Sequence, residues 1–264
     1  MLKNYIFINI LERIRLLLIK TTRLLNKKVI NIDKNKKKII FNTQYIWAFS
    51  ELEFFCASQL HSQGHQVLMV ICDDLPYTER EIFSIKKVLS LKKCSERTLR
   101  YCKAYGLNYL KMSEFLDEKD RVNAKKISQK KINEIENYKI GNINIGELSK
   151  RNHAHYYKGD LPLRGEYELF YRRIFESALL IYFAFSKILK KYKNFNLISA
   201  NGKFIQTAIP SIINKNLGNN FYTYEVFGQG NGVILDKNKM SLEQRLDDVW
   251  DELKIFPLSK TERE

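Results

Sequence analysis

The sequence KKKIIFNTQYIWAFSELEFFCASQLHSQGHQVLMVICDD, residues 36–74, contains a complete strand–helix–strand unit. The short apolar run at 36–45 predicts a first strand. Residues 48–65 predict a helix, because apolar side chains recur every three or four positions and Gly64 is placed to end it. Residues 66–74 are apolar through their middle, which is typical of a strand buried on both faces of a parallel sheet. We therefore expect an α/β fold, with a Rossmann-like parallel sheet flanked by helices.

A second unit of the same kind follows near the end of the sequence. Residues 195–202 predict a strand, 203–218 a helix that is bent or capped near Pro210, and 220–226 the next strand. Between the two units, 165–193 predicts a long helix whose middle is apolar on nearly every side, as in a helix buried against a sheet. Strands and helices therefore alternate along the chain, as parallel strands joined by crossover helices require.

Five residues fall at the carboxyl ends of these predicted strands: Asp73, Asp74, Asn201, Gly202 and Glu225. Open α/β sheets bind their ligands at this edge. Asp73 or Asp74 could orient a hydroxyl group or deprotonate it as a general base. Asn201, Gly202 and Glu225 are candidates for substrate binding. The alternative for each is turn chemistry alone, in which acids, asparagine and glycine simply end a strand.

The turn after the first strand reads NTQYIWAFSE, residues 42–51, and contains no glycine. A dinucleotide-binding fold places G-x-G-x-x-G there, so that backbone N–H groups reach the pyrophosphate. The sequence also has no GxxxxGK[ST] phosphate loop. We therefore expect that this domain binds no cofactor and does not hold a nucleotide through its first loop.

The segment GNINIGELSKRNHAHYYKGD, residues 141–160, is rich in turn formers and has little periodicity, so we expect a loop. Ser149 and Arg151 could contact a phosphate or a sugar from it. His153 and His155 would lie on one side of an extended segment, where either could act as a base near neutral pH. A metal site there would need a third ligand that the sequence does not indicate, and we expect no metal.

The formal net charge of +16 predicts attraction to an anionic partner, either nucleic acid, an acidic membrane surface or a phosphorylated substrate. A biased genome composition is the alternative explanation. The basic residues are scattered along the sequence and no nucleic-acid-binding motif is present, so we expect no specific nucleic acid. The four cysteines have no CxxC spacing, which argues against structural zinc and favours a reducing cytosol.

Residues 1–30 predict an amphipathic basic helix, because apolar residues recur at helical spacing from Phe7 to Leu25. Charged residues interrupt the segment too often for a membrane span. Residues 1–38 contain eleven Lys or Arg and two acids, a net charge of +9. Such a helix could lie at an anionic membrane surface, and the alternative is packing on this domain or on a partner domain.

Two stretches resemble the N-terminal domain of bacterial glycosyltransferases of the GT-B fold, in the group found in capsule and surface-polysaccharide biosynthesis. They are SELEFFCASQLHSQGHQVLMVICDDLPYTERE, residues 50–81, and SANGKFIQTAIPSIINKNLGNNFYTYE, residues 199–225. The shared motifs are GHQV, the acidic strand end with LPxxE, LS at 148–149, NG at 201–202 and YE at 224–225, in this order. The resemblance covers roughly residues 38–235.

The resemblance implies an acceptor-binding domain. In the GT-B fold two Rossmann-like domains face each other, the N-terminal domain handles the acceptor and the C-terminal domain binds the sugar nucleotide. We therefore expect three parts: residues 1–30 as the basic helix, 36–235 as the Rossmann-like domain, and 236–264 as a helical tail or the start of an interdomain linker. The nucleotide-sugar donor would be bound by a C-terminal donor domain or a partner subunit.

The expected activity is transfer of a hexose from a nucleotide sugar to a saccharide or lipid-linked acceptor, and it is incomplete without the donor domain. We expect a cytoplasmic protein, which the basic helix could bring to the inner face of the cell membrane. One alternative is a non-catalytic accessory module that binds a glycan or a partner protein. A nucleic-acid-binding protein is the third interpretation.

Overall fold

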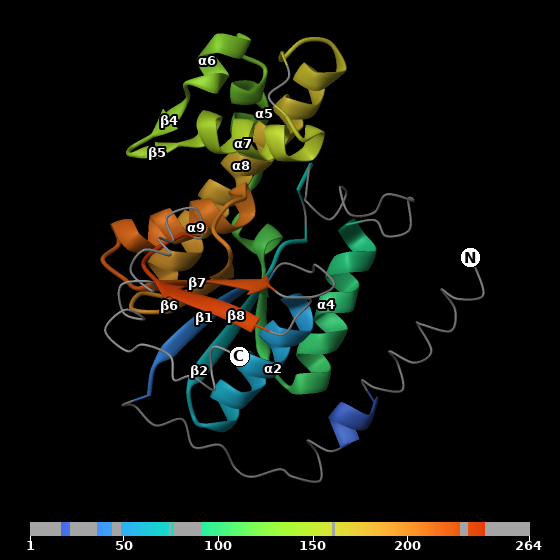
Figure 1. The fold of residues 1–264 in the computed structure, drawn as a ribbon, viewed down its shortest axis with the longest axis vertical. Helices are drawn as coiled ribbons and strands as arrows, with labels where there is room; N and C mark the ends of the chain where they lie inside the picture. The colour runs from blue at the N-terminus through green and yellow to red at the C-terminus, as the bar shows by residue number, and fades with distance from the viewer. Residues whose placement is uncertain are drawn as a thin grey trace, which may run out of the picture.

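The computed structural model describes residues 17–21, 36–43, 49–73, 75–76, 91–159, 162–227 and 232–240. A six-stranded sheet in the order β3-β2-β1-β6-β7-β8 forms its centre, with helices on both faces (Figure 1). The strands β1, β2, β3, β6 and β7 are parallel, and β8 is antiparallel to β7. The chain is therefore α/β with a mostly parallel sheet, which confirms the expected Rossmann-like class.

The elements follow the predicted alternation of strands and helices. The sheet strands are β1 (Lys38–Thr43), β2 (Gln66–Ile71), β3 (Asn108–Lys111), β6 (Asn196–Ala200), β7 (Phe221–Phe227) and β8 (Gly232–Lys237). The helices are α2 (Phe49–Ser62), α4 (Leu91–Tyr105), the 3₁₀ turn η1 (Met112–Phe115), α5 (Glu118–Ser128), α6 (Ile132–Glu136), α7 (Ile145–Tyr157), α8 (Glu166–Lys191) and α9 (Ile205–Asn216). The short strands β4 (Lys139–Ile140) and β5 (Ile143–Asn144) form a separate antiparallel pair.

The central strands are apolar because both faces of the sheet are covered. In β1 and in β2, five of six residues are buried. Alternate residues belong to two different cores, as the pleat of a strand requires. Ile39, Phe41 and Met69 pack with α2 and α4, whereas Ile40 and Val70 pack with α8 and α9. The strand order reverses between β1 and β6, so the helices of the first unit and those of the second lie on opposite faces.

The prediction of a loop at 141–160 is wrong for residues 145–157, which form the helix α7. The side chain of Asn144 accepts a hydrogen bond from Glu147 N at 3.1 Å and so caps the first turn. The buried positions Ile145, Leu148, Ser149 and Asn152 do have helical spacing. Two of those four side chains are polar, so a search for apolar periodicity misses the helix.

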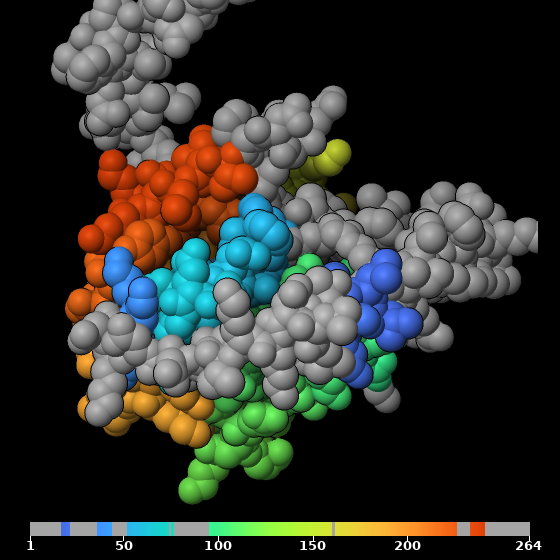
Figure 2. Space-filling model, turned by 90° about the horizontal axis from the view of Figure 1, so that it is seen from below, coloured from blue at the N-terminus to red at the C-terminus, as the bar shows by residue number. Residues whose placement is uncertain are grey.

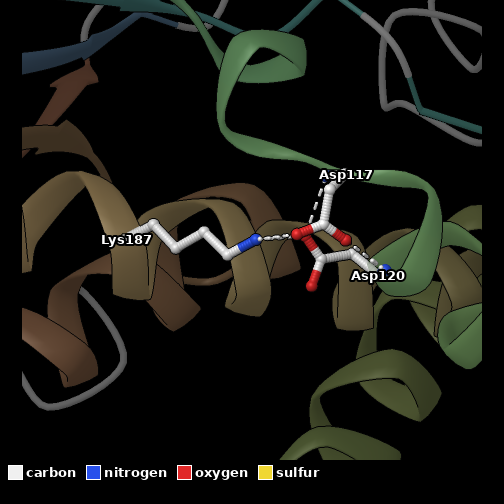
Figure 3. A network of polar contacts seen from close by, with 3 residues as sticks. All are labelled: Asp117, Asp120 and Lys187. Atoms are coloured by element: carbon white, nitrogen blue, oxygen red, sulfur yellow. Dashed lines mark hydrogen bonds and ion pairs between the residues drawn. The ribbon is translucent and has the colours of Figure 1, made fainter.

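Helix α8 runs alongside α5 and η1, and Lys187 ties it to the start of α5 (Figure 3). The ammonium group of Lys187 lies 3.0 Å from Asp117 Oδ2 and 2.5 Å from Asp120 Oδ2. Asp117 and Asp120 also form a reciprocal capping box at the N-terminus of α5. The hydrogen bond from Asp120 N and the neighbouring Lys187 lower the pKa of Asp117, and the two carboxylates raise the pKa of Lys187.

Only a short part of the expected N-terminal helix lies within the described residues. Residues 17–21 are helical, and Ile19 packs against the core formed by β1, β2, α2 and α4. The helical tail expected at 236–264 is wrong at its start, because residues 236 and 237 belong to β8 and 238–240 are not helical. The remainder of 1–30 and of this tail lies outside the described residues. Within the described ranges, no helix is both long and apolar enough to cross a membrane.

Candidate functional site

The point where the strand order reverses lies between β1 and β6, and several buried polar side chains gather at this part of the carboxyl edge. Thr43, at the end of β1, is fully buried, and Ser199 and Asn201 at the end of β6 are also buried. A buried polar group is costly without a hydrogen-bond partner, so such a concentration needs a specific arrangement. Ligands of open α/β sheets bind at this location.

Asn42 links three elements at this point. Its side-chain amide donates to Ser199 Oγ at 3.1 Å and to the carbonyl oxygen of Gln206, in the first turn of α9, at 2.5 Å. Gln206 is four residues before Pro210, which has no N–H and cannot make the usual helical hydrogen bond to that carbonyl. Asn42 therefore supplies the donor that Pro210 lacks. Helix α9 continues through Pro210, so the cap expected there is wrong, and the helix is supported at this point from β1.

The turn from β6 into α9 carries Asn201 and Gly202, two of the residues predicted to bind substrate. Asn201 N donates to Tyr224 O at 2.8 Å, and its side-chain oxygen accepts from Lys203 N at 3.0 Å. The φ angles of Asn201 and Gly202 are +25° and +69°. A Cβ on Gly202 would approach Met240 Cγ to 2.9 Å, so the turn needs glycine both for its backbone angle and for its close contact.

Two backbone N–H groups at the very start of α9, those of Phe204 and Ile205, already have side-chain partners within the protein. Ile205 N donates to the side-chain oxygen of Asn152 in α7 at 2.9 Å, and Phe204 N donates to Thr207 Oγ1 at 3.3 Å. The N-terminus of a helix is a common phosphate site because these donors are usually free. Here Asn152 and Thr207 occupy donors that a phosphate would otherwise use.

Glu225 lies on β7, beside the turn at Asn201. Its Oε2 is 3.8 Å from the ammonium group of Lys203, and 27% of its side chain is exposed. The register pairs Ala200 of β6 with Tyr224 of β7, so Glu225 reaches the level of Asn201. The structure therefore brings together Asn201, Gly202 and Glu225, as the sequence predicts.

Glu53 is a buried acid that was not among the residues predicted to form the site. It is 2% exposed, and Tyr224 Oη donates to its Oε1 at 2.6 Å across the sheet face. Burial and the neighbouring Glu53 raise the pKa of Tyr224 well above its ordinary value of 10.0. Burial and Glu53 also raise the pKa of the Cys56 thiol. One sequence feature could have indicated that Glu53 is buried. It stands between Leu52 and Phe54 in a helix that is predicted to pack on the sheet.

Asp73 lies just beyond β2 at the same edge, but two strands away from β6. Its two carboxylate oxygens accept hydrogen bonds from Ser113 N at 2.9 Å and from Ser113 Oγ at 2.6 Å. These contacts fix the start of η1 after β3. Asp74 lies outside the described residues, and a catalytic role for either acid stays a prediction.

The candidates in 141–160 do not form one site. Ser149 is buried within α7 and donates to Ile145 O at 2.8 Å, while Arg151 is exposed and pairs with Glu147 at 3.2 Å. His153 is buried among aromatic rings, whereas His155 packs its ring against Phe204 at 4.8 Å between centroids. The two histidines have different surroundings because α7 is a helix, and residues two apart on a helix do not share a face.

The arrangement is suited to hydrogen bonding with a neutral polar ligand. It offers the carboxamide of Asn201 and the ion pair of Lys203 with Glu225, next to the buried polar ends of β1 and β6. Among the described residues, no group of His, Cys, Asp and Glu side chains could hold a metal ion. Comparison with protein-family models, with curated proteins and with solved structures gave no significant match to this chain.

Proposed function

We propose that the carboxyl edge at β1, β6 and β7 binds the hydroxyl-bearing acceptor of a glycosyltransferase reaction, in a protein of the GT-B type. One observation carries the proposal: the edge presents amide and carboxylate groups, while backbone donors at the start of α9 are bonded to Asn152 and Thr207. A nucleotide diphosphate needs free backbone donors or a cluster of cations. A sugar needs side chains that both donate and accept.

Each residue at the edge has a role in this proposal. Asn201 and Glu225 would hydrogen-bond the acceptor hydroxyls, and Lys203 would hold the carboxylate of Glu225 in place. Gly202 keeps the turn close to the ligand. Asp73 would position η1 through Ser113 at the rim of the site. The nucleotide-sugar donor would be bound by a separate donor domain, in the synthesis of a surface or capsular polysaccharide.

Ligand binding to the purified chain tests the proposal. We would use saturation-transfer NMR and calorimetry with the methyl glycosides of glucose, galactose and N-acetylglucosamine, and with UDP as the nucleotide probe. We expect saccharide binding and no UDP binding. Glu225→Gln should weaken saccharide binding roughly tenfold or more, because a hydrogen bond to a charged group contributes about 1.5–3 kcal/mol.

The matched control is Glu134→Gln, which removes an exposed carboxylate of α6 that pairs with Lys130. It should leave saccharide binding unchanged. The proposal fails if UDP binds tightly while none of the glycosides does, or if both substitutions have the same effect.

A non-catalytic glycan-binding module is a second candidate, and a specific observation favours it. Both carboxylate oxygens of Asp73 accept hydrogen bonds from Ser113, and Oε2 of Glu225 is buried, 3.8 Å from the Lys203 ammonium group. A general base must be able to reach the proton that it removes. Saccharide binding that persists while no nucleotide sugar is turned over by the natural full-length protein would support this candidate over the transferase.

A further inference from the structure

Lysine residues that are scattered in the sequence meet at the amino edge of the sheet, opposite the candidate site. Lys37 O accepts from Gln66 N at 3.1 Å, and the Lys38 ammonium lies 6.0 Å from the centre of the Phe195 ring, so the starts of β1, β2 and β6 are adjacent. Because β8 is antiparallel, its last residue pairs with Tyr222 at the start of β7. The exposed lysines at these strand ends, and in the last turns of α4 and α9 that lead into β3 and β7, are Lys36, Lys37, Lys38, Lys103, Lys193, Lys215 and Lys237.

The segments that form this amino-edge face contain no acid. Their described residues are 36–39, 61–66, 103–108, 192–196, 215–221 and 237–238, and none of them is Asp or Glu. The opposite edge carries Asp73 and Glu225. The sheet therefore separates a strongly positive edge from an edge of mixed charge, and the basic residues form a surface that their order in the sequence conceals.

Apolar side chains are exposed on the same face. Figure 2 shows residues 17–21 and the start of β1 on the face seen from below. Ile19 fixes this segment to the core of β1, β2, α2 and α4, while Leu17 and Leu18 are 64% and 61% exposed. Lys20 is exposed beside them. A lysine next to a pair of exposed leucines is a combination found in segments that lie at a lipid interface.

We propose that the amino-edge face docks on an anionic phospholipid bilayer. The lysines would attract the headgroups, and Leu17 and Leu18 would enter the boundary between headgroups and acyl chains. Nucleic acid is a less suitable partner for this face, because all seven of its exposed cations are lysines. None is an arginine, whose planar, bidentate guanidinium group phosphate and base recognition favours. Nucleic acid also offers no apolar layer for the leucines.

The proposed docking does not depend on saccharide binding, but it determines where the candidate site would lie relative to the bilayer. The carboxyl edge would face away from the bilayer, at the far end of the strands. A strand of six residues is about 20 Å long. The site would therefore meet the part of a membrane-anchored molecule that extends this far from the lipid surface.

Co-sedimentation of the full chain with vesicles tests the proposal. The vesicles would be phosphatidylcholine alone, or phosphatidylcholine mixed with phosphatidylglycerol. We expect binding to the anionic vesicles that weakens with added salt. The variant Lys37→Glu with Lys193→Glu and Lys215→Glu should lower the partition constant by about a hundredfold or more, since each lysine near an anionic surface contributes about 1 kcal/mol. Leu17→Ser with Leu18→Ser should weaken binding and leave its salt dependence unchanged.

The control variant Lys126→Glu with Lys131→Glu and Lys139→Glu makes the same change of charge on exposed lysines of α5, β4 and the loop before α6. It should bind vesicles much more tightly than the edge variant, and circular dichroism would establish that both are folded. The proposal would be overturned if the two variants lost vesicle binding equally, or if the unsubstituted protein did not bind anionic vesicles. It would also be overturned if the same three edge lysines controlled retention on RNA or DNA while vesicles were not bound.

Discussion

The side-chain amide of Asn42 donates to the carbonyl of Gln206 at 2.5 Å, in the place of the backbone N–H that Pro210 does not have. A proline inside a helix usually costs about 3 kcal/mol or more, partly because one carbonyl loses its partner. In this chain the missing donor comes from a strand 164 residues earlier. The contact also fixes α9 to the end of β1, which is where the candidate site lies.

A double-mutant cycle would measure this dependence. Asn42→Ala should lower the free energy of unfolding by about 1–3 kcal/mol, because it leaves the buried Gln206 carbonyl without its donor. In a Pro210→Ala background the new N–H can bond that carbonyl, so the same substitution should cost less. Chemical denaturation of the four proteins gives the coupling energy. Strictly additive effects would contradict this account.

Tyr224 and Glu53 should contribute to stability in a way that depends on alkaline pH. The pKa of Tyr224 is raised in the folded protein, so the stability that it contributes is present below about pH 10 and is lost as the pH rises toward the folded pKa. Tyr224→Phe removes a hydrogen bond to a buried carboxylate and should cost about 1.5–3 kcal/mol at neutral pH. Thermal melts across the alkaline range should show a weaker pH dependence in the variant. Tyr156→Phe, at an exposed position on α7, is the control.

Gly146 should tolerate no side chain. An added Cβ would overlap the carbonyl oxygens of Ile135 and Glu136, which are backbone atoms and cannot move aside easily. Gly146→Ala should therefore lower the stability by about 1–3 kcal/mol or more through overpacking. Gly159→Ala, where a Cβ would meet no atom within 4 Å, should change the melting temperature little. Equal melting temperatures for the two variants would show that α7 and α6 are not held this closely.

The Asp117–Lys187 contact should stabilise the protein above acid pH. The pKa of Asp117 is lowered from 3.8, so its contribution is present above about pH 4 and is lost as the pH falls through the lower, folded value. Asp117→Asn keeps a side chain that can cap α5 but removes the charge. Melting temperatures of this variant should therefore fall less steeply in acid than those of the unsubstituted protein. Added salt should reduce the difference, because the pair is exposed.

The sequence was sufficient for the α/β class and for four of the six sheet strands, but it did not predict the antiparallel strand β8. Apolar runs such as 66–74 indicate burial on both faces, and the ends of the predicted strands indicate the carboxyl edge of the sheet. Asn201, Gly202 and Glu225 do lie close together there, although Glu225 lies within β7, which continues to Phe227. Local patterns did not reveal contacts between distant segments. Glu53 has a neighbour in Tyr224 that is 171 residues away, and nothing near it in the sequence indicates that partner.

Two other misses have different physical causes. Helix α7 escaped detection because buried positions such as Ser149 and Asn152 are polar and find hydrogen-bond partners inside the fold. The lysines of the amino-edge face belong to several separate segments, so their convergence is a property of the topology alone. Scattered positions in the sequence therefore do not exclude a basic surface, and comparing retention on vesicles with retention on nucleic acid distinguishes the two partners.

The path of the chain after β8 has a consequence for anything attached to it. Lys239 O accepts from Thr223 Oγ1 at 2.6 Å, and the side chain of Met240 lies against Gly202, so the backbone passes directly beside the β6–α9 turn. A group tethered within a few residues of Met240 would be held near Asn201 at an effective concentration on the order of millimolar. Even a weak ligand or a weakly associating domain carried there would occupy the site for much of the time, and a competitor in solution would have to exceed that local concentration to displace it.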